Sequence, residues 1–113
     1  MFIVLLDEPG LFVFRSPADA VRGIEPIDAE SEIRAAFDDA AVPYTVEWVR
    51  PNRHRKTLLG LLRSIEPGEY RFMPAGPPQP AALIELLEGH PEHTAPPETK
   101  ADLDALLSRL RGV

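Results

Sequence analysis

Basic side chains gather in one short segment of the chain, Arg50 to Lys56. The segment contains four of the twelve lysines and arginines and one of the three histidines: Arg50, Arg53, His54, Arg55 and Lys56. An arginine can form two parallel hydrogen bonds to a carboxylate or a phosphate, so this cluster suits an acidic protein partner or a phosphate group. Because clustered charges are rarely buried, we predict that residues 50–56 form an exposed loop joining two strands.

A second candidate set is acidic and lies between residues 28 and 39. Residues 1–49 carry ten acids against three bases, residues 50–71 carry two acids against six bases, and residues 72–113 carry six acids against three bases. The net charge is therefore −6, which argues against a dedicated nucleic-acid-binding protein because the phosphate field acts on the whole molecule. An acidic surface can steer and bind a basic protein. The second set of predicted partner-binding residues is Asp28, Glu30, Glu32, Asp38 and Asp39.

Residue patterns typical of catalysis and metal binding are absent or interrupted. His90-Pro91-Glu92-His93 brings two histidines together, but Pro91 interrupts the helix that would align them and no His-Glu-x-x-His pattern occurs. The chain has no Gly-x-Ser-x-Gly, Ser-x-x-Lys, P-loop or dinucleotide-binding motif. The lack of cysteine excludes thiol nucleophiles, disulfides and zinc–thiolate sites. We predict a non-enzymatic protein without a metal or other cofactor.

Length and composition indicate one globular domain, residues 1–113, in the cytoplasm. The chain is 44% hydrophobic and 27% charged, as is typical of soluble domains. Its apolar first six residues lack a preceding basic region, and residues 7–10 interrupt them, so we do not expect them to form a signal peptide. No run approaches the roughly 18 apolar residues of a membrane span, and the absence of cysteine fits a reducing compartment. The oligomeric state is left open.

Local patterns in the first half of the chain predict a hairpin, two helices and a strand. Residues 2–6 and 11–15 are β-prone runs on either side of turn residues 7–10. Ser16 and Pro17 are typical of the start of a helix, which we expect over residues 17–23. Ile33, Ala36, Phe37 and Ala40 follow helical spacing and predict a helix over residues 28–41. Alternating apolar residues predict a strand over residues 42–49.

The second half of the chain predicts a hairpin followed by two helices. The leucine-rich residues 57–65 fit either a strand or a helix, and the turn signal at residues 66–69 favours a hairpin of 57–65 with 69–73. Apolar stripes predict helices over residues 80–88 and 99–111, separated by a proline-rich linker at 89–98. The predicted fold class is α+β, with helices packed on a small, mostly antiparallel sheet of about four to five strands.

Several short motifs resemble those of small uncharacterised bacterial α+β proteins of the toxin-immunity type. The resemblance covers about half of the chain, and the matching residues are Phe14-x-Ser16, Ala20, Ile24-Glu25, Asp28, Phe37-Asp38 and the leucine-rich helix from Leu103 to Leu110. The resemblance implies an α+β fold and an inhibitor that blocks a secreted toxin. It implies no catalytic residues.

Three functions are compatible with these patterns, and the sequence leaves them open. The first is a protein-binding domain, with an immunity-type inhibitor as its specific form, in which the acids between residues 28 and 39 meet a basic partner. The second is a nucleic-acid or phosphate-binding protein that acts through the basic segment 50–56. The third is an enzyme of unrecognised type, or a domain with no assigned activity. The first is our primary prediction, and the sequence does not decide which of the two segments makes the contact.

Overall fold

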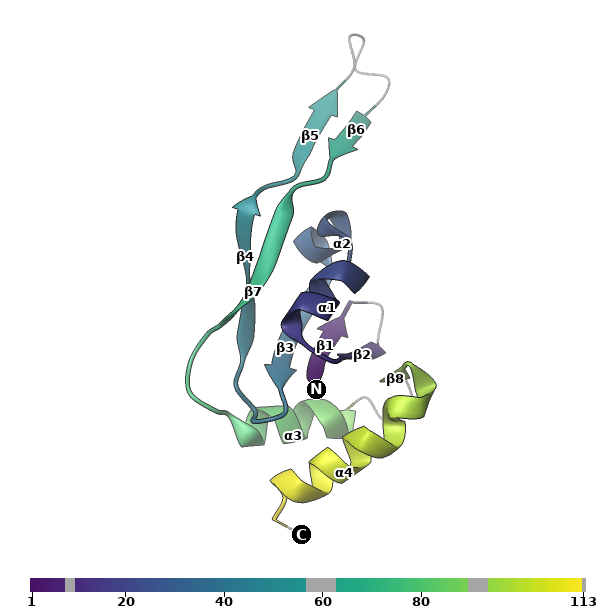
Figure 1. The fold of residues 1–113 in the computed structure, drawn as a ribbon, viewed down its shortest axis with the longest axis vertical. Helices are drawn as coiled ribbons and strands as arrows, with labels where there is room; N and C mark the ends of the chain where they lie inside the picture. Colours follow the sequence, from purple (N-terminus) through teal and green to yellow (C-terminus); the bar gives the residue numbers. More distant parts are fainter. Residues whose placement is uncertain (8–9, 57–62, 90–93, 113) are drawn as a thin grey trace.

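The computed structural model describes residues 1–7, 10–56, 63–89 and 94–112, and Figure 1 shows how the elements are arranged. In chain order the elements are β1 (Phe2–Leu6), β2 (Gly10–Phe14), α1 (Pro17–Gly23), α2 (Pro26–Ser31), β3 (Ile33–Asp38), β4 (Tyr44–Arg50), β5 (Arg53–Lys56), β6 (Arg63–Glu66), β7 (Glu69–Pro74), α3 (Pro80–Gly89), β8 (Thr94–Ala95), the 3-10 turn η1 (Pro97–Thr99) and α4 (Lys100–Leu110). Helices packed against mainly antiparallel strands confirm the predicted α+β class.

The central sheet has the strand order β3-β1-β2-β8. β1 and β2 pair antiparallel from Phe2↔Phe14 to Leu6↔Gly10, which confirms the predicted hairpin. β1 also pairs antiparallel with β3, while the two-residue β8 pairs parallel with β2. Strand β1 is buried on both faces, because Phe2, Ile3 and Val4 are 0% exposed. Successive strand side chains point to opposite faces, so β1 contributes to a core on each side of the sheet.

One core lies between the central sheet and a second antiparallel pair, β4–β7. Phe2 and Val4 contact α1, α2 and the inner face of β7 there. The Phe2 ring packs edge-on against Tyr44 of β4 and Phe72 of β7, with ring centroids 5.0 Å apart in both pairs. Ser16 begins α1 as predicted, because its hydroxyl accepts a hydrogen bond from the amide of Asp19.

The second core lies on the other face of the central sheet, where α3 and α4 pack (Figure 1). Ile3 and Leu11 from the sheet meet Leu83 of α3 and Leu103 and Leu106 of α4. The predicted helices 80–88 and 99–111 correspond to α3 and α4, with the last helix beginning one residue later. Both helices therefore bury the apolar stripes that their sequences indicated.

The predicted helix over residues 28–41 is wrong. α2 ends at Ser31, and Ile33 to Asp38 form strand β3 along β1. The apolar spacing of Ile33, Ala36 and Phe37 suits a helix, but tertiary pairing overrides such local patterns. Because β1 is buried on both faces, it is an interior strand, and β3 provides its second neighbour.

The predicted pairing of residues 57–65 with 69–73 is also wrong. β7 pairs with β4, in a register that includes Trp48↔Tyr70, and β6 pairs with β5. The predicted strand 42–49 corresponds to β4, which begins two residues later, while residues 57–62 lie outside the described part of the chain. The basic segment is a loop only at Pro51 and Asn52, since its last four residues form β5.

The predicted linker 89–98 contains regular structure. Gly89 ends α3, Thr94 and Ala95 form β8, and η1 begins at Pro97, while residues 90–93 lie outside the described range. The pairing of β8 with β2 makes the central sheet mixed rather than purely antiparallel. No helix among the described residues is long and apolar enough to cross a membrane.

Candidate functional site

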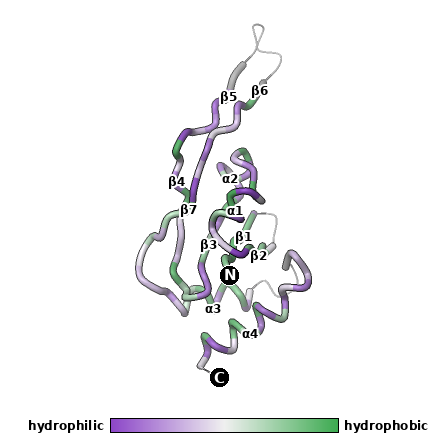
Figure 2. The backbone as a smooth tube through the Cα atoms, viewed as in Figure 1, coloured by the Kyte–Doolittle hydropathy of each residue, from purple (hydrophilic) through white to green (hydrophobic). Residues whose placement is uncertain are grey.

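A two-stranded arm extends from the body of the protein. The β4–β7 pair passes beside α1 and α2 and is continued by the β5–β6 pair, which lies at the far end of the molecule (Figure 1). The molecule is consequently elongated, with principal extents of 61 × 28 × 20 Å. Figure 2 shows that β7 is largely hydrophilic where it approaches this extension. We use the word arm for residues 50–56 and 63–69, which include β5 and β6, and the word body for the rest of the chain.

Cross-strand pairing balances the charges near the base of the arm. Glu47 lies opposite Arg71, and the carboxylate oxygen is 2.6 Å from the guanidinium. Farther along, Glu69 is the partner of Arg50 in the register. Opposite charges across an antiparallel pair stabilise it, by about 0.2–1 kcal/mol per pair. The first part of the basic segment is therefore matched by acids on the facing strand.

Toward the distal end, the register places fewer bases opposite acids. Arg53 still faces Glu66, but Arg55 faces Ser64 and Lys56 faces Arg63. Directly opposed like charges destabilise a strand pair. The register therefore places no carboxylate directly opposite the last basic residues of β5. Over the whole arm, five bases against two acids give a net charge of +3, whereas the remaining residues carry −9.

Asn52 joins the arm to α2. Its Nδ2 donates to the carbonyl oxygen of Pro26 at 2.9 Å and to Oε2 of Glu30 at 2.7 Å. Its Oδ1 accepts from the backbone amide of Gly68, on the other chain of the arm, at 2.7 Å. Nε2 of His54 lies 2.9 Å from Oε1 of Glu30. These hydrogen bonds from Asn52 and His54 hold the pKa of Glu30 below its usual value of 4.5.

A polar hollow of about 290 Å³ lies on the arm, lined by Arg50, Pro51, Arg53, Glu66 and Pro67. Arg50 and Arg53 are exposed. Each guanidinium carries five N–H donors, more than one carboxylate can satisfy. The hollow can therefore accept a carboxylate or phosphate oxygen from a partner while Arg53 keeps its cross-strand neighbour Glu66.

The predicted acidic residues do not form one surface. Asp28 and Glu30 lie in α2, with Glu32 directly after it, whereas Asp38 and Asp39 lie where β3 turns into β4. Because residues 33–38 form β3 and not a helix, the acids of α2 and those of the β3–β4 turn lie at opposite ends of this strand. The predicted acidic contact residues therefore lie on two separate elements of the fold.

Two of these acids have structural roles in the β3–β4 turn. Oδ1 of Asp38 accepts from the backbone amides of Ala40 and Val42 at 2.9 and 3.0 Å, and Oδ2 accepts from the Tyr44 hydroxyl at 3.2 Å. The turn includes Ala41 at φ 63°, a left-handed conformation that Asp38 helps to hold. Burial and the nearby charge of Asp38 raise the pKa of Tyr44. Asp39 pairs with the amino terminus at 3.2 Å.

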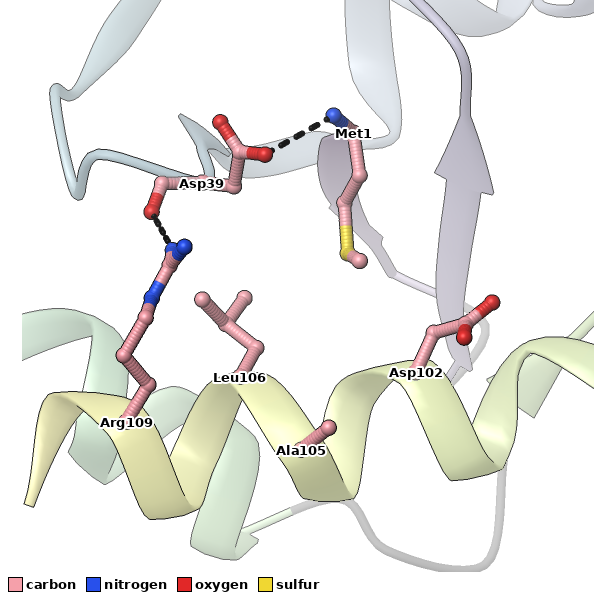
Figure 3. A pocket seen from close by; sticks show the side chains of 6 residues that line it. All are labelled: Met1, Asp39, Asp102, Ala105, Leu106 and Arg109. Carbon is pink, nitrogen blue, oxygen red and sulfur yellow. Dashed lines mark hydrogen bonds and ion pairs between the residues drawn. The ribbon is translucent and has the colours of Figure 1, made fainter. Parts of the chain in front are cut away.

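An open pocket lies beside this turn (Figure 3). It has a volume of about 280 Å³ and is lined by Met1, Asp39, Asp102, Ala105, Leu106 and Arg109. Figure 3 shows the amino group of Met1 directed at Asp39, and Arg109 reaching the backbone oxygen of the same residue. The contact of Arg109 fastens α4 to the turn after β3, and Met1, Asp39 and Arg109 thus have partners within the fold.

Among the described residues, no three histidine or acidic side chains are grouped as a metal site would require. The His90 and His93 pair lies outside the described range. Sequence reasoning missed Asn52 and Arg63. Arg63 adjoins the leucine-rich run, where the sequence left strand and helix open, so its position opposite Lys56 could not be foreseen.

Comparison with known proteins adds no relative. No family model, curated protein or solved structure matches the chain. The function must therefore be argued from the site itself.

Proposed function

We propose that this protein is a protein-binding domain that engages an acidic surface of its partner through the arm. The observation that carries the proposal is the separation of charge, with +3 on the arm and −9 on the rest of the chain. The basic positions that the register places opposite no carboxylate lie at the distal end of the arm, where Lys56 is paired with Arg63. Like charges held opposite each other cost folding energy, and an anionic partner would remove that cost.

The length of the arm makes local charge more important than net charge. A four-residue strand such as β5 spans about 13 Å at about 3.3 Å per residue. This exceeds the Debye length of about 8 Å at physiological ionic strength. The distal bases are thus largely screened from the acids of the body, and an approaching acidic surface meets a positive arm first. Such steering raises association rates.

A protein partner fits these charges better than a nucleic acid does. A local acidic patch interacts with the arm alone, whereas the extended phosphate field also repels the acidic body. The arm replaces the acidic residues 28–39 as our proposed contact because Glu30, Asp38 and Asp39 are engaged within the fold. An immunity-type inhibitor remains one form of the proposal, in which the partner is a toxin with an acidic contact surface.

Partner capture in the source organism tests the proposal. A photo-crosslinking amino acid replaces Val49, which is 59% exposed next to the arm, and crosslinked proteins are identified by mass spectrometry. The recovered protein is purified, and its association rate is measured with wild type and with a triple Arg55→Ser, Lys56→Ser, Arg63→Ser variant. The matched control removes three bases from the body, Arg15, Arg22 and Lys100, and thus changes the net charge equally.

The arm variant should associate at least about tenfold more slowly at low salt, while the control stays close to wild type. Equal losses in both variants would refute a local role of the arm. If no protein is recovered and a DNA duplex binds instead, with a logarithmic salt slope near −2.7 for about three neutralised phosphates, the nucleic-acid function is correct.

A further inference from the structure

The arm has a joint, residues 51–52 and 67–68, at which strand pairing is interrupted in both of its segments at the same level. Pro51 and Asn52 separate β4 from β5, and Pro67 and Gly68 separate β7 from β6. Proline lacks the backbone N–H that a strand ladder requires. The β4–β7 register also shifts between Trp48 and Arg50, directly before the joint. Strand pairing alone therefore does not fix the direction of β5–β6 relative to β4–β7.

The joint is nevertheless closely packed. A Cβ atom at Gly68 would lie 2.0 Å from the backbone oxygen of Arg50 and 2.6 Å from the carbonyl carbon of Pro51. Because these are backbone atoms, a side chain at residue 68 would force the two chains apart. The glycine lets its amide approach Asn52 and donate to Oδ1 at 2.7 Å. Asn52 thereby holds the two chains of the arm together at the joint.

The same side chain links the joint to the body. The Asn52 amide group donates both to the Pro26 backbone and to the Glu30 carboxylate in α2. Glu30 also contacts His54, two residues farther along the arm. Asn52 and His54 are thus held by one carboxylate of a helix that packs in the first core through Ala29. α2 acts as a fixed support for the arm.

Holding His54 against α2 determines which face of the arm is presented. Adjacent residues in a strand point to opposite faces, so Arg53 lies on the face away from α2. Arg53 is exposed there and lines the polar hollow with Arg50 and Glu66. A change in arm direction would move this hollow relative to the body without altering any residue that lines it.

We propose that Asn52 is a positioning residue that sets the direction of the arm and the face it offers to a partner. The effect on the partner rests on the proposed function, whereas the effect on arm direction does not. Asn52 makes its contacts at a partly exposed position and belongs to neither core cluster among the described residues. Its removal should therefore alter arm geometry more than it alters overall folding.

Pulsed electron–electron double resonance measures the distance between two spin labels, and thus reports the direction of the arm relative to the body. The chain has no cysteine, so Lys56→Cys on the arm and Ser108→Cys on α4 give a single labelled pair. The test variant is Asn52→Asp, which has nearly the same shape but cannot donate to Pro26 and places a second carboxylate beside Glu30. The matched control, Thr45→Ala, changes an exposed residue of β4 in the same hairpin.

The distance distribution should be shifted and broadened in Asn52→Asp and unchanged in the control, with similar circular dichroism in all samples. The double variant Asn52→Asp, Glu30→Gln restores a carboxylate–amide pair with exchanged roles and should narrow the distribution again. A purely structural weakening would not be rescued by this exchange. If Asn52→Asp fails to fold, Glu30→Ala, which removes the shared support of Asn52 and His54, should give the same broadening.

A wild-type distribution in Asn52→Asp, or in Glu30→Ala when that variant is used, would overturn the positioning role. Partner association, measured with the protein identified by crosslinking, separates the two proposals. Suppose that Asn52→Asp broadens the distance distribution but the Arg55, Lys56 and Arg63 substitutions leave the association rate unchanged. This result would refute the proposed binding function and support the positioning role of Asn52. Slower association of those arm variants together with an unchanged distribution in Asn52→Asp would do the reverse.

Discussion

Replacing Tyr70 by phenylalanine tests how the β4–β7 pair is fastened to the body. Tyr70 is 2% exposed, and its ring contacts Trp48 and Phe72 at centroid distances of 5.4 and 5.8 Å. Its hydroxyl donates to the backbone oxygen of Ile24 at 2.5 Å. Since Ile24 is the residue that caps the C-terminal end of α1, this hydrogen bond joins the helix to the strand pair. Phenylalanine keeps the ring contacts and removes only the hydroxyl.

The expected loss follows from leaving a buried carbonyl oxygen without its partner. Such a loss costs about 1–3 kcal/mol. An unfolding entropy of about 2.1 cal/mol/K per residue over 113 residues corresponds to about 4 °C per kcal/mol. Tyr70→Phe should therefore lower the Tm by about 4–12 °C in a calorimetric or circular dichroism melt at neutral pH. Tyr44→Phe, at a half-buried position, is the control and should lower it less.

The stability of wild type and that of Tyr70→Phe should also depend differently on alkaline pH. Burial, with a smaller effect of the Asp28 charge, raises the pKa of Tyr70 from 10.0 to about 12. A raised pKa gives stability that is fully present below the unfolded pKa and is lost as the pH rises through the folded one. Wild type should thus lose stability between pH 10 and 12 relative to Tyr70→Phe. A Tm within about 1 °C of wild type at neutral pH, or parallel curves in alkali, would refute the reasoning.

Three further substitutions test local features of the fold. Ser16→Ala removes the side-chain cap of α1 and should cost about 0.5–2 kcal/mol in urea unfolding; no measurable change would mean that the cap is dispensable. Gly68→Ala places a methyl group against the Arg50 backbone and should cost at least about 1–3 kcal/mol in the same assay, so an unchanged midpoint would contradict the close approach. The lowered pKa of Glu30 gives stability that is present above pH 4.5 and is lost at lower pH. The stability difference between wild type and Glu30→Gln should accordingly shrink from about pH 5 to about pH 3, and a constant difference would exclude this linkage.

Elements with strong local signals could be predicted from the sequence. The β1–β2 hairpin, α1, α3 and α4 are present close to their expected bounds. Each combines an apolar pattern with its own turn, cap or stop residues, so neighbouring positions in the chain decide the structure. Ser16 illustrates this, since its predicted capping role needs only the amide of Asp19, three residues away.

Elements whose structure depends on distant residues could not be predicted in this way. Residues 33–38 satisfy a helical spacing and also form a strand, and the choice is made by pairing with β1. The pairing of β7 with β4 likewise depends on contacts between residues that are distant in the sequence. Trp48 and Tyr70 meet across β4 and β7, where the inner residues of both strands cover Phe2. That arrangement buries the aromatic residues, an advantage that is invisible within either strand's own sequence.

The candidate site was predicted in part, because residue type indicates charge but not its partners. The basic cluster does occur on an extended segment, on which Arg50, Arg53 and His54 are exposed. Which of its members are balanced depends on the strand register, which pairs Arg50 with Glu69 but places Arg63 opposite Lys56. Asn52 carried no chemical signal in the sequence, and its importance comes from three contacts with distant parts of the chain.

The two cores and the arm impose different requirements on the chain. Both core clusters share the central sheet, and neither, among the described residues, includes a residue of β5 or β6. Changes of side chain beyond the joint are therefore expected to cost little folding energy, as long as the strand pairing persists. The contact surface that we propose therefore lies on a part of the molecule where substitutions can change partner binding with little effect on folding.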